Sequence, residues 1–268
     1  MAPREKRSTD GGSRFAWRGR PKRPWRRHTM LLLDLTLPTP AENLALDEAL
    51  LEEAEAAGRP LETLRLWEPS HLFVVVGRSS QRAQEVRLEA CREAGVAVLR
   101  RASGGAAVVV GPGCLMYTAV LSYQLRPALR AVDHAHRFVL ERIARSLRRL
   151  VPSVRRCGIS DLALDDRKFS GNSMRTKRTH FLYHGTLLYD FPLRWADRLL
   201  NTPPRQPTYR RRRSHGQFLI NLPLSLTPLR AALIEAWPIS GPRRDWPRQD
   251  TLRLVAERYG RREWHEVR

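Results

Sequence analysis

Short apolar segments and a few longer helical stripes alternate along most of this chain. Leu72-Phe73-Val74-Val75-Val76-Gly77 is a nearly continuous apolar run, which is typical of a strand buried on both faces. Thr39-Pro40-Ala41-Glu42 has the sequence of a capping box with proline at the first helical position, so a helix is expected to begin there. Its apolar stripe continues towards Gly58, a residue suited to ending a helix.

The same patterns give the other elements. We predict strands at 31–37, 64–67, 72–77, 96–99, 107–110, 115–125, 160–164, 168–174 and 181–189. We predict helices at 40–58, 80–94, 132–150, 193–200, 226–237 and 249–259, and a loop at 203–213. Strands that come in runs between a few helices indicate an α+β fold and not alternating βαβ units.

Three regions are expected from these patterns. Residues 1–29 lack an apolar period and hold ten basic and two acidic residues, so we predict a disordered basic tail. It is a nucleic-acid or membrane arm, a tail without function, or a segment upstream of a true start at Met30; we favour the last two. Residues 30–240 are expected to form the main domain, and 241–268 a Pro/Gly/Arg-rich linker with a terminal helix.

Composition narrows the class of protein. The net charge of +21 comes almost entirely from arginine, which favours anionic partners and allows nonspecific nucleic-acid binding. The three cysteines are odd in number and widely spaced, so neither a disulfide framework nor a cysteine metal site is expected. Neither a membrane-spanning run nor a signal peptide is visible, and we expect a soluble cytoplasmic protein.

One stretch carries the clearest candidate chemistry. Lys168 precedes Phe169-Ser170-Gly171-Asn172, and His184-Gly185-Thr186 follows after a basic interval. A lysine near a glycine can place its ammonium beside backbone that a ligand approaches closely. The alternative is that Lys168 lies at a solvated hairpin tip after Asp165-Asp166, and the pattern alone leaves both open.

A second block lies upstream, at Arg100-Arg101-Ala102-Ser103-Gly104-Gly105-Ala106. In this order, the arginine pair with its Ser-Gly-Gly-Ala, the lysine with Ser-Gly-Asn, and the His-Gly-Thr resemble the catalytic domain of lipoate-protein ligases, within the wider biotin and lipoate ligase family. The resemblance runs from about Leu31 to about Pro223. It implies the class II synthetase-like fold, with a mixed, largely antiparallel sheet flanked by helices.

The resemblance also implies a two-step reaction. Lipoate or octanoate is activated by ATP, with Mg²⁺, to an acyl-adenylate, and the acyl group then passes to a lysine of a lipoyl-domain acceptor. Such acceptors are subunits of 2-oxoacid dehydrogenases or the glycine cleavage carrier protein. Many of these ligases carry an accessory domain, and the residues after Gly241 are too few for one, so a separate accessory protein is possible.

Residue roles follow from matching the family's motifs. Lys168 takes the part of the catalytic cation. Asp161 helps to hold Mg²⁺ near the nucleotide, or is a surface aspartate at a strand end. Substrate binding falls to the glycine loop, the arginine pair and the two later motifs: Arg100, Arg101, Ser103, Gly104, Gly105, Ala106, Gly171, Asn172, His184 and Gly185. Ala106 replaces a third glycine of the family, and a family His-Asp pair is Val110-Gly111 here.

Two other functions stay open. Relatives on the same scaffold transfer octanoyl or lipoyl groups without ATP through a cysteine thioester, and Cys157 lies in the loop ahead of Lys168. The positive charges of Arg155, Arg156 and Lys168 would activate such a thiolate. The second alternative is a non-catalytic basic module that binds nucleic acid. Arg205 and the arginines at 210–213 either steer an acidic acceptor or are solvated. Asn43 and Asp47 are interpreted as capping or core polar residues.

Overall fold

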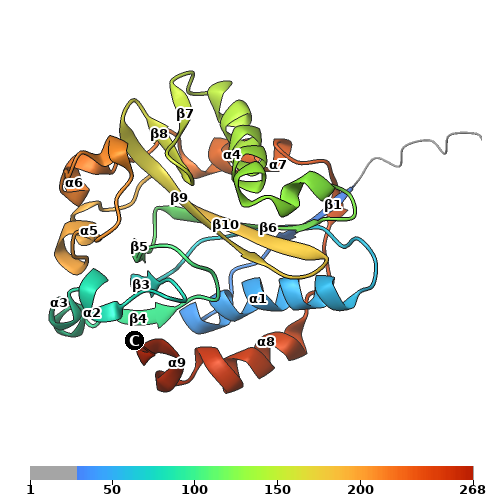
Figure 1. Cartoon of the computed structure of the whole chain (residues 1–268), viewed down its shortest axis with the longest axis horizontal. Coiled ribbons are helices and arrows are strands. Elements are labelled where there is room, and N and C mark those ends of the chain that lie inside the picture. Colours follow the sequence, from blue (N-terminus) through green and yellow to red (C-terminus); the bar gives the residue numbers. More distant parts are fainter. Residues whose placement is uncertain (1–28, 268) are drawn as a thin grey trace, which may run out of the picture.

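The main sheet spans the whole molecule. The structure is a computed structural model that describes residues 29–267. Within that range, eight strands form the sheet in the order β11-β1-β2-β6-β10-β9-β8-β7 (Figure 1). β1 pairs in parallel with β2 and β11, and the other neighbours are antiparallel. The bounds are β1 Met30–Asp34, β2 Thr63–Trp67, β6 Cys114–Ser122, β7 Val154–Cys157, β8 Asp161–Leu164, β9 Arg167–Thr176, β10 His180–Leu188 and β11 Ile239–Pro242.

A smaller sheet lies beside one end of the main sheet. β3 (Phe73–Val76) is its central strand, parallel to β4 (Ala97–Arg100) and antiparallel to β5 (Val108–Val110). All four residues of β3 are buried, as a continuous apolar run predicts. The α+β fold with a mixed, largely antiparallel sheet is therefore confirmed.

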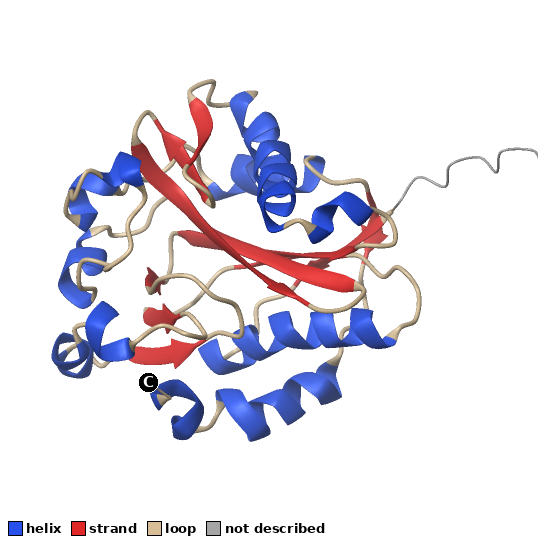
Figure 2. Cartoon of the chain, viewed as in Figure 1, coloured by secondary structure: helices blue, strands red, loops and turns tan. Residues whose placement is uncertain are grey.

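Helices cover both faces of the main sheet (Figures 1 and 2). α4 (Val132–Arg148) and α7 (Leu226–Glu235) lie on one face, and α1 (Pro40–Ala56) and α8 (Arg248–Leu254) on the other. Shorter helices complete the chain: α2 Arg82–Glu85, α3 Leu88–Glu93, η1 Pro127–Arg130, α5 Arg194–Leu199, η2 Thr208–Arg210, α6 His215–Phe218, η3 Val255–Tyr259 and α9 Arg262–Glu266. No helix among the described residues is long and apolar enough to cross a bilayer.

Alternation along β10 decides which side chains reach which helix layer. Phe181 and Tyr183 belong to the core cluster beneath α4 and α7, whereas Leu182 packs with residues of α1. Side chains at every second position of a strand share a face. His184 therefore points to the α1 side, where it meets a polar residue of that helix.

Three sequence predictions are corrected here. The helix predicted at 80–94 is two short helices, because Val86 between them is extended and forms a bridge with Leu200. The strand β7 was missed; only four residues long, it carries two arginines. The predicted linker begins inside β11, which pairs with β1, and α8 then packs on α1. The predictions for residues 1–28 lie outside the described residues.

The capping box at the start of α1 is confirmed. The Thr39 hydroxyl accepts a hydrogen bond from the Glu42 backbone N–H at 3.2 Å, and the Glu42 carboxylate accepts one from the Thr39 N–H at 2.9 Å. Two of the unpaired N–H groups at this end of the helix are thereby satisfied.

Replacing the capping threonine tests this start. We expect Thr39→Ala to lower the free energy of unfolding by about 1 kcal/mol, because the Glu42 N–H loses its acceptor. Denaturant unfolding of the purified protein measures the change. Ser225→Ala is the matched control, since Ser225 precedes α7 without a side-chain capping bond. Equal losses in the two variants would contradict the capping role.

Candidate active site

A cavity of about 840 Å³ opens between the two sheets and the helices α5 and α6. Its wall takes residues from β9 and β10, from the loop after β4, from the turn after β7 and from the segment 200–210. Most of the predicted site residues come together in this wall: Arg101, Gly105, Ala106, Asp161, Lys168, Gly171, Asn172, His184 and Gly185. Segments that are far apart in sequence therefore form one site.

Lys168 lies in the cavity wall and is held by an ion pair. Its Nζ is 2.8 Å from Oδ1 of Asp161, and its side chain keeps 24% of its surface exposed. The other carboxylate oxygen of Asp161 accepts a hydrogen bond from the Tyr209 hydroxyl at 2.8 Å. Burial and the adjacent Asp161 charge both raise the pKa of Tyr209, so the phenol stays protonated as a donor. Lys168 does follow the β8–β9 turn at Asp165-Asp166, as the hairpin alternative expects, but its ammonium is paired in the cavity wall and does not lie in bulk solvent.

Two glycines make room for this arrangement. A Cβ at Gly171 would lie 2.7 Å from the Lys168 Nζ. A Cβ at Gly185 would lie 1.8 Å from the Asn172 Oδ1. Asn172 is fixed by the Tyr117 hydroxyl, which donates to Oδ1 at 2.6 Å, and by its own Nδ2, which donates to the Ser160 carbonyl at 2.8 Å. Glycine is thus required for close approach and not for a turn.

Arg101 shapes the glycine loop. Its guanidinium donates to the carbonyls of Gly104, Ala106 and Val75 and to the Ser103 hydroxyl. Burial lowers the pKa of Arg101 to about 10, opposed by the charge of Glu85, so the side chain remains a cation at neutral pH. Its hydrogen bonds go to protein carbonyls. The geometry supports a role in building the loop, while gripping a substrate remains a prediction.

Arg100 does not lie in the cavity wall. Its residue is 1% exposed, and its guanidinium donates to the carbonyls of Gly77, Ser80 and His265. The neighbouring arginines of a strand point to opposite faces, which separates them here. The expectation that Arg100 grips a substrate is corrected: it binds the C-terminal segment to the turn after β3.

His184 is oriented by Asp47, which sequence reasoning did not assign to the site, and by Ser103, which it did. Its Nδ1 lies 3.3 Å from Oδ2 of Asp47, and its Nε2 lies 2.6 Å from the Ser103 hydroxyl oxygen. With the proton on Nδ1 facing the carboxylate, Nε2 accepts from Ser103. Ser103 is buried and lies behind the cavity wall, so its loop is held to β10 through His184.

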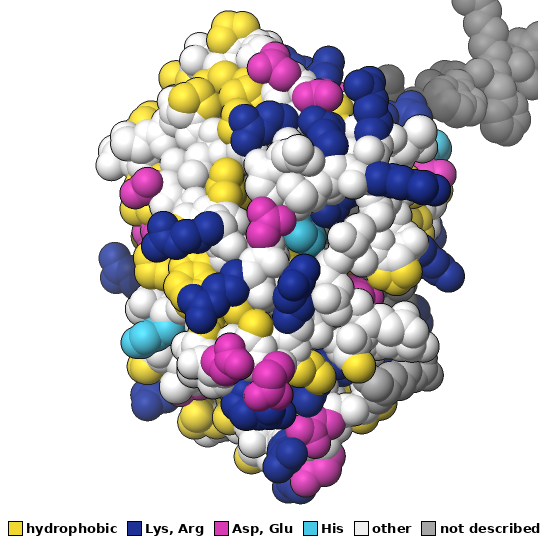
Figure 3. All heavy atoms as spheres, turned by 90° about the vertical axis from the view of Figure 1, so that its left-hand side faces the viewer, with side chains coloured by type: hydrophobic (Ala, Val, Ile, Leu, Met, Phe, Trp, Pro, Cys, Tyr) yellow, Lys and Arg dark blue, Asp and Glu magenta, His cyan; other side chains and the backbone are white. Residues whose placement is uncertain are grey.

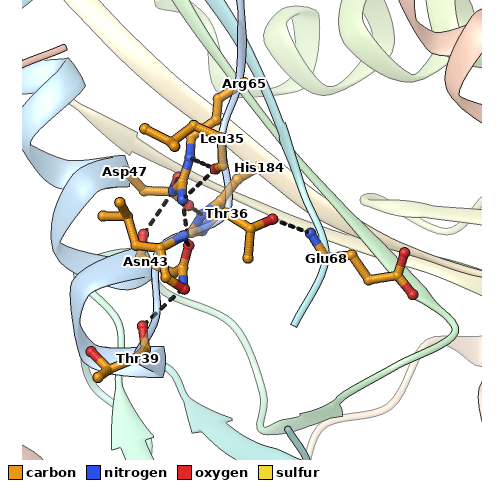
Figure 4. Close-up of polar contacts among 9 residues, drawn as sticks. Leu35, Thr36, Thr39, Asn43, Asp47, Arg65, Glu68 and His184 are labelled. Carbon is orange, nitrogen blue, oxygen red and sulfur yellow. Dashed lines mark hydrogen bonds and ion pairs between the residues drawn. The ribbon is translucent and has the colours of Figure 1, made fainter. Parts of the chain in front are cut away.

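Asp47 belongs to a buried charged network (Figure 4). Arg65, which is fully buried, donates to Asp47 at 2.6 Å and to the Asn43 Oδ1 at 2.6 Å. Burial acts to raise the pKa of Asp47, but the Arg65 charge and the His184 hydrogen bond outweigh it, so this pKa is lowered. The interpretation of Asn43 and Asp47 as polar core residues was incomplete. Their spacing of four on one helix face was the available signal.

Cys157 lies at the end of β7, directly across from Asp161. Its thiol is free and half-buried, and the residue does not contribute to the cavity wall, whereas the next residue, Gly158, does. Arg156 is 3.8 Å from Glu141, so it does not face Cys157 as a free cation. Arg156, one of the two arginines expected to activate the thiol, is thus paired with a carboxylate instead.

Comparison with known proteins identifies the family. The family model for the lipoyl protein ligase A/B catalytic domain matches residues 39–231. This chain belongs to that family. The Aeropyrum pernix protein named "putative lipoate-protein ligase A" is 35% identical over 59% of this chain and 57% of the relative. The octanoyltransferase LipM of Kyrpidia tusciae is 27% identical over 77% and 83%. The chain spans about half the length of the first curated relatives that it matches.

Solved structures agree on the fold. A bipartite lipoate protein ligase from Thermoplasma acidophilum, studied with its E2 lipoyl domain, superposes with a TM-score of 0.73 at 21% identity, covering 90% of this chain and 97% of that one. A lipoate-protein ligase A bound with ATP gives a TM-score of 0.69 at 21% identity, over 89% and 98%. The predicted family and fold are both confirmed.

The buried network makes a stability prediction. Asp47→Asn removes the charge that faces the buried Arg65 guanidinium, so we expect the free energy of unfolding at neutral pH to fall by about 3 kcal/mol. Asp34→Asn is the control, because Asp34 pairs with Arg230 at the surface and such pairs contribute at most about 1 kcal/mol.

The direction of the Asp47 pKa shift predicts how the stabilisation by this pair changes with pH. The pKa of Asp47 is lowered from its ordinary value of 3.8 on folding, so its stabilisation is present above that value and is lost as pH falls through the lowered one. The difference between wild type and Asp47→Asn should therefore shrink in acid, as measured by denaturant unfolding across this range. A difference that stays constant down to the acid limit would contradict the charged pair.

Proposed function

We propose that this protein is a lipoate-protein ligase. It activates lipoate or octanoate with ATP and transfers the acyl group to a lysine of a lipoyl-domain acceptor protein. The observation that carries the proposal is the Lys168 ammonium, which shares one cavity wall with Gly105 and Ala106 of the glycine loop. Membership in the family and the ATP bound to a similar fold support it.

The first step joins the carboxylate to the nucleotide. A carboxylate oxygen of the acid attacks the α-phosphorus of ATP, a P–O bond forms, and pyrophosphate leaves with the electrons of the bond that breaks. Charge accumulates on phosphate and carboxylate oxygens in a site partly closed to water. Lys168 supplies a fixed positive charge there, which stabilises the transition state, and Asp161 and Tyr209 keep its position.

The second step transfers the acyl group. The neutral amine of the acceptor lysine attacks the acyl carbonyl, a C–N bond forms, and AMP leaves with the electrons of the C–O bond while the amine loses a proton. The acyl chain lies against apolar wall residues, which exclude water from it. These include Leu44, Val75, Val109, Met116 and Leu188.

Mg²⁺ enters this proposal only as a companion of ATP. No cluster of three His, Cys, Asp or Glu side chains suited to a metal occurs among residues 29–267. Both carboxylate oxygens of Asp161 already have partners. A magnesium ion often keeps several waters and takes one or two carboxylates beside the phosphates. The residues present do not form a protein-held site, and neither step above depends on the ion.

A second candidate function is acyl transfer without ATP, and the coverage of a transferase relative favours it. The octanoyltransferase LipM relative covers more of this chain than the ligase relative does, and Cys157 lies across from Asp161. In that alternative the Cys157 thiolate attacks the thioester carbonyl of an acyl carrier protein, the new enzyme thioester forms as the carrier thiolate leaves with the electrons of its C–S bond, and ATP is not consumed. The position of Cys157 outside the cavity wall favours the ligase. A non-catalytic basic module would not require a half-buried ammonium in a cavity wall.

Two substitutions separate these functions. The purified chain is incubated with ATP, lipoate or octanoate and an unmodified E2 lipoyl domain, and the intact mass of that domain is measured. We expect Lys168→Met to lower the rate of adenylate formation by about 10²-fold or more, while Cys157→Ser keeps full, ATP-dependent activity. Modification that proceeds without ATP and is lost in Cys157→Ser would instead establish the transferase.

A glycine substitution tests the placement of the ammonium. Gly171→Ala puts a methyl group 2.7 Å from the Lys168 Nζ, so the ammonium must leave Asp161. We expect adenylate formation to fall about tenfold or more with little change in the denaturation midpoint. Gly241→Ala is the control, because nothing lies within 4 Å of its added carbon. Full activity in Gly171→Ala would show that the observed position of Lys168 is not needed.

The proposal also includes the acceptor domain and a separate accessory protein. A lipoyl domain of a 2-oxoacid dehydrogenase subunit or a glycine cleavage carrier protein would present its lysine to the cavity. The T. acidophilum ligase is bipartite, which supports the possibility of a separate accessory protein for this chain. Adding cell extract that stimulates the purified chain would reveal such a partner, and full activity of the chain alone would remove the need for one.

A further inference from the structure

An exposed isoleucine stands at the mouth of the cavity. Ile159 lies in the turn at 158–160 between β7 and β8, keeps 68% of its surface exposed, and contributes to the cavity wall. The other large apolar side chains that are comparably exposed among the described residues do not line it; they are Val132, Leu150, Leu252 and Val267. A large apolar side chain exposed next to a cavity is typical of an interaction surface.

The turn that carries Ile159 is supported from behind. Gly158 adopts a positive φ of 53°, and a Cβ added to it would lie 3.4 Å from the Pro207 side chain and 3.5 Å from the Tyr209 ring. Tyr209 in turn donates to Asp161, the partner of Lys168. The turn is therefore fixed relative to the ammonium at the centre of the site.

Cations without acidic partners lie on the segment whose Pro207 and Tyr209 support this turn. Arg205 contributes to the cavity wall and is exposed. Arg211 and Arg212 are exposed in left-handed conformations, with φ of 52° and 58°. In the part of the chain that the structure describes, none of these three side chains forms an ion pair. Three positive charges are thus available to a partner.

The neighbouring arginines are already used. Arg210 is buried against the Phe218 ring at 4.9 Å, and Arg213 pairs with Asp166 at 3.3 Å. The steering role expected for the whole run at 210–213 is therefore restricted to its exposed members. Figure 3, which views the side of the molecule with α5 and α6, shows separate Lys and Arg side chains set among hydrophobic patches.

We propose that Ile159, Arg205, Arg211 and Arg212 form the docking surface for the acceptor domain. This rests on the proposed ligase function and names the partner's chemistry: a protein domain with acidic residues around its target lysine and an apolar spot that receives Ile159. The three cations attract that domain and orient it. Burial of Ile159 then slows dissociation, as apolar anchors do at interfaces. The docked lysine faces the cavity that Ile159 borders.

Direct binding tests the surface without requiring catalysis. The dissociation constant of an unmodified E2 lipoyl domain is measured by calorimetry for wild type, Ile159→Asp and the double variant Arg211→Glu/Arg212→Glu. We expect each variant to weaken binding about tenfold or more. The effect of the double variant should largely disappear at about 0.5 M salt, because screening removes the steering charges. Without acceptor, the double variant should release pyrophosphate at the wild-type rate.

Matched controls carry the same chemical changes elsewhere. Leu252→Asp alters another exposed apolar side chain, on α8, and Arg244→Glu/Arg248→Glu alters two exposed arginines before and at the start of α8. We expect both controls to bind the domain within about twofold of wild type. Unchanged affinity in Ile159→Asp and in the double variant, or equal losses in the controls, would overturn the docking surface.

Two further outcomes are distinguishable. If Arg211→Glu/Arg212→Glu loses affinity for a generic single-stranded RNA and keeps its affinity for the lipoyl domain, the surface binds nucleic acid and the proposal is overturned. If wild type neither releases pyrophosphate nor modifies the domain, the proposed ligase function fails. In contrast, the docking surface alone is overturned if the protein has ligase activity but its affinity for the lipoyl domain is unchanged by the substitutions at Ile159, Arg211 and Arg212.

Discussion

The buried pair of Arg65 and Asp47 is the interaction on which the rest of the site depends. A guanidinium inside a sheet is costly unless its donors and its charge are satisfied. Here Asp47 and Asn43 of α1 and the Leu35 carbonyl after β1 accept its hydrogen bonds, and Trp67 lies 5.0 Å from it. One side chain thus fixes the rotation of α1 against the sheet.

That fixed rotation determines where the glycine loop lies. Asp47 reaches His184 on β10, and His184 reaches Ser103 in the loop after β4. The main sheet and the small sheet are joined through this chain of contacts. Arg101 then binds the loop's own carbonyls, which gives the loop a defined shape without regular secondary structure. The wall facing Lys168 is therefore held in place by buried charged side chains.

Sequence patterns could predict elements whose cause is local. The capping box at Thr39, the valine run of β3 and the alternation along β10 each act over a few residues, and each was confirmed. The break at Val86 and the strand β11 depend on partners distant in sequence, Leu200 and β1. No local pattern encodes such a pairing, which is why one long helix and a linker were predicted instead.

The site also divides into features that a local pattern predicts and features that depend on residues distant in sequence. The motif residues were recognised, and most of them do meet in one cavity, but their order in the chain does not reveal which arginine of the pair faces it. Arg65 was the overlooked signal: a charged residue within an apolar strand requires a buried partner. Asn43 and Asp47 were visible as polar positions on one helix face, yet only the packed structure joins them to His184.

The C-terminal segment also supports the glycine loop. Glu48 follows Asp47 on α1 and is buried with Arg258 and Tyr259, which donate to it at 2.6 Å and 2.7 Å. Arg175 of β9 joins Glu48 to the Ala102 carbonyl beside the glycine loop, and His265 accepts from the Arg100 backbone N–H at 2.9 Å. Adjacent acids of α1 thus hold the two sides of one loop, Asp47 through His184 and Glu48 through the C-terminal helices. The residues after β11 are consequently part of the site's support, because removing them would leave both Glu48 and Arg100 buried without these partners.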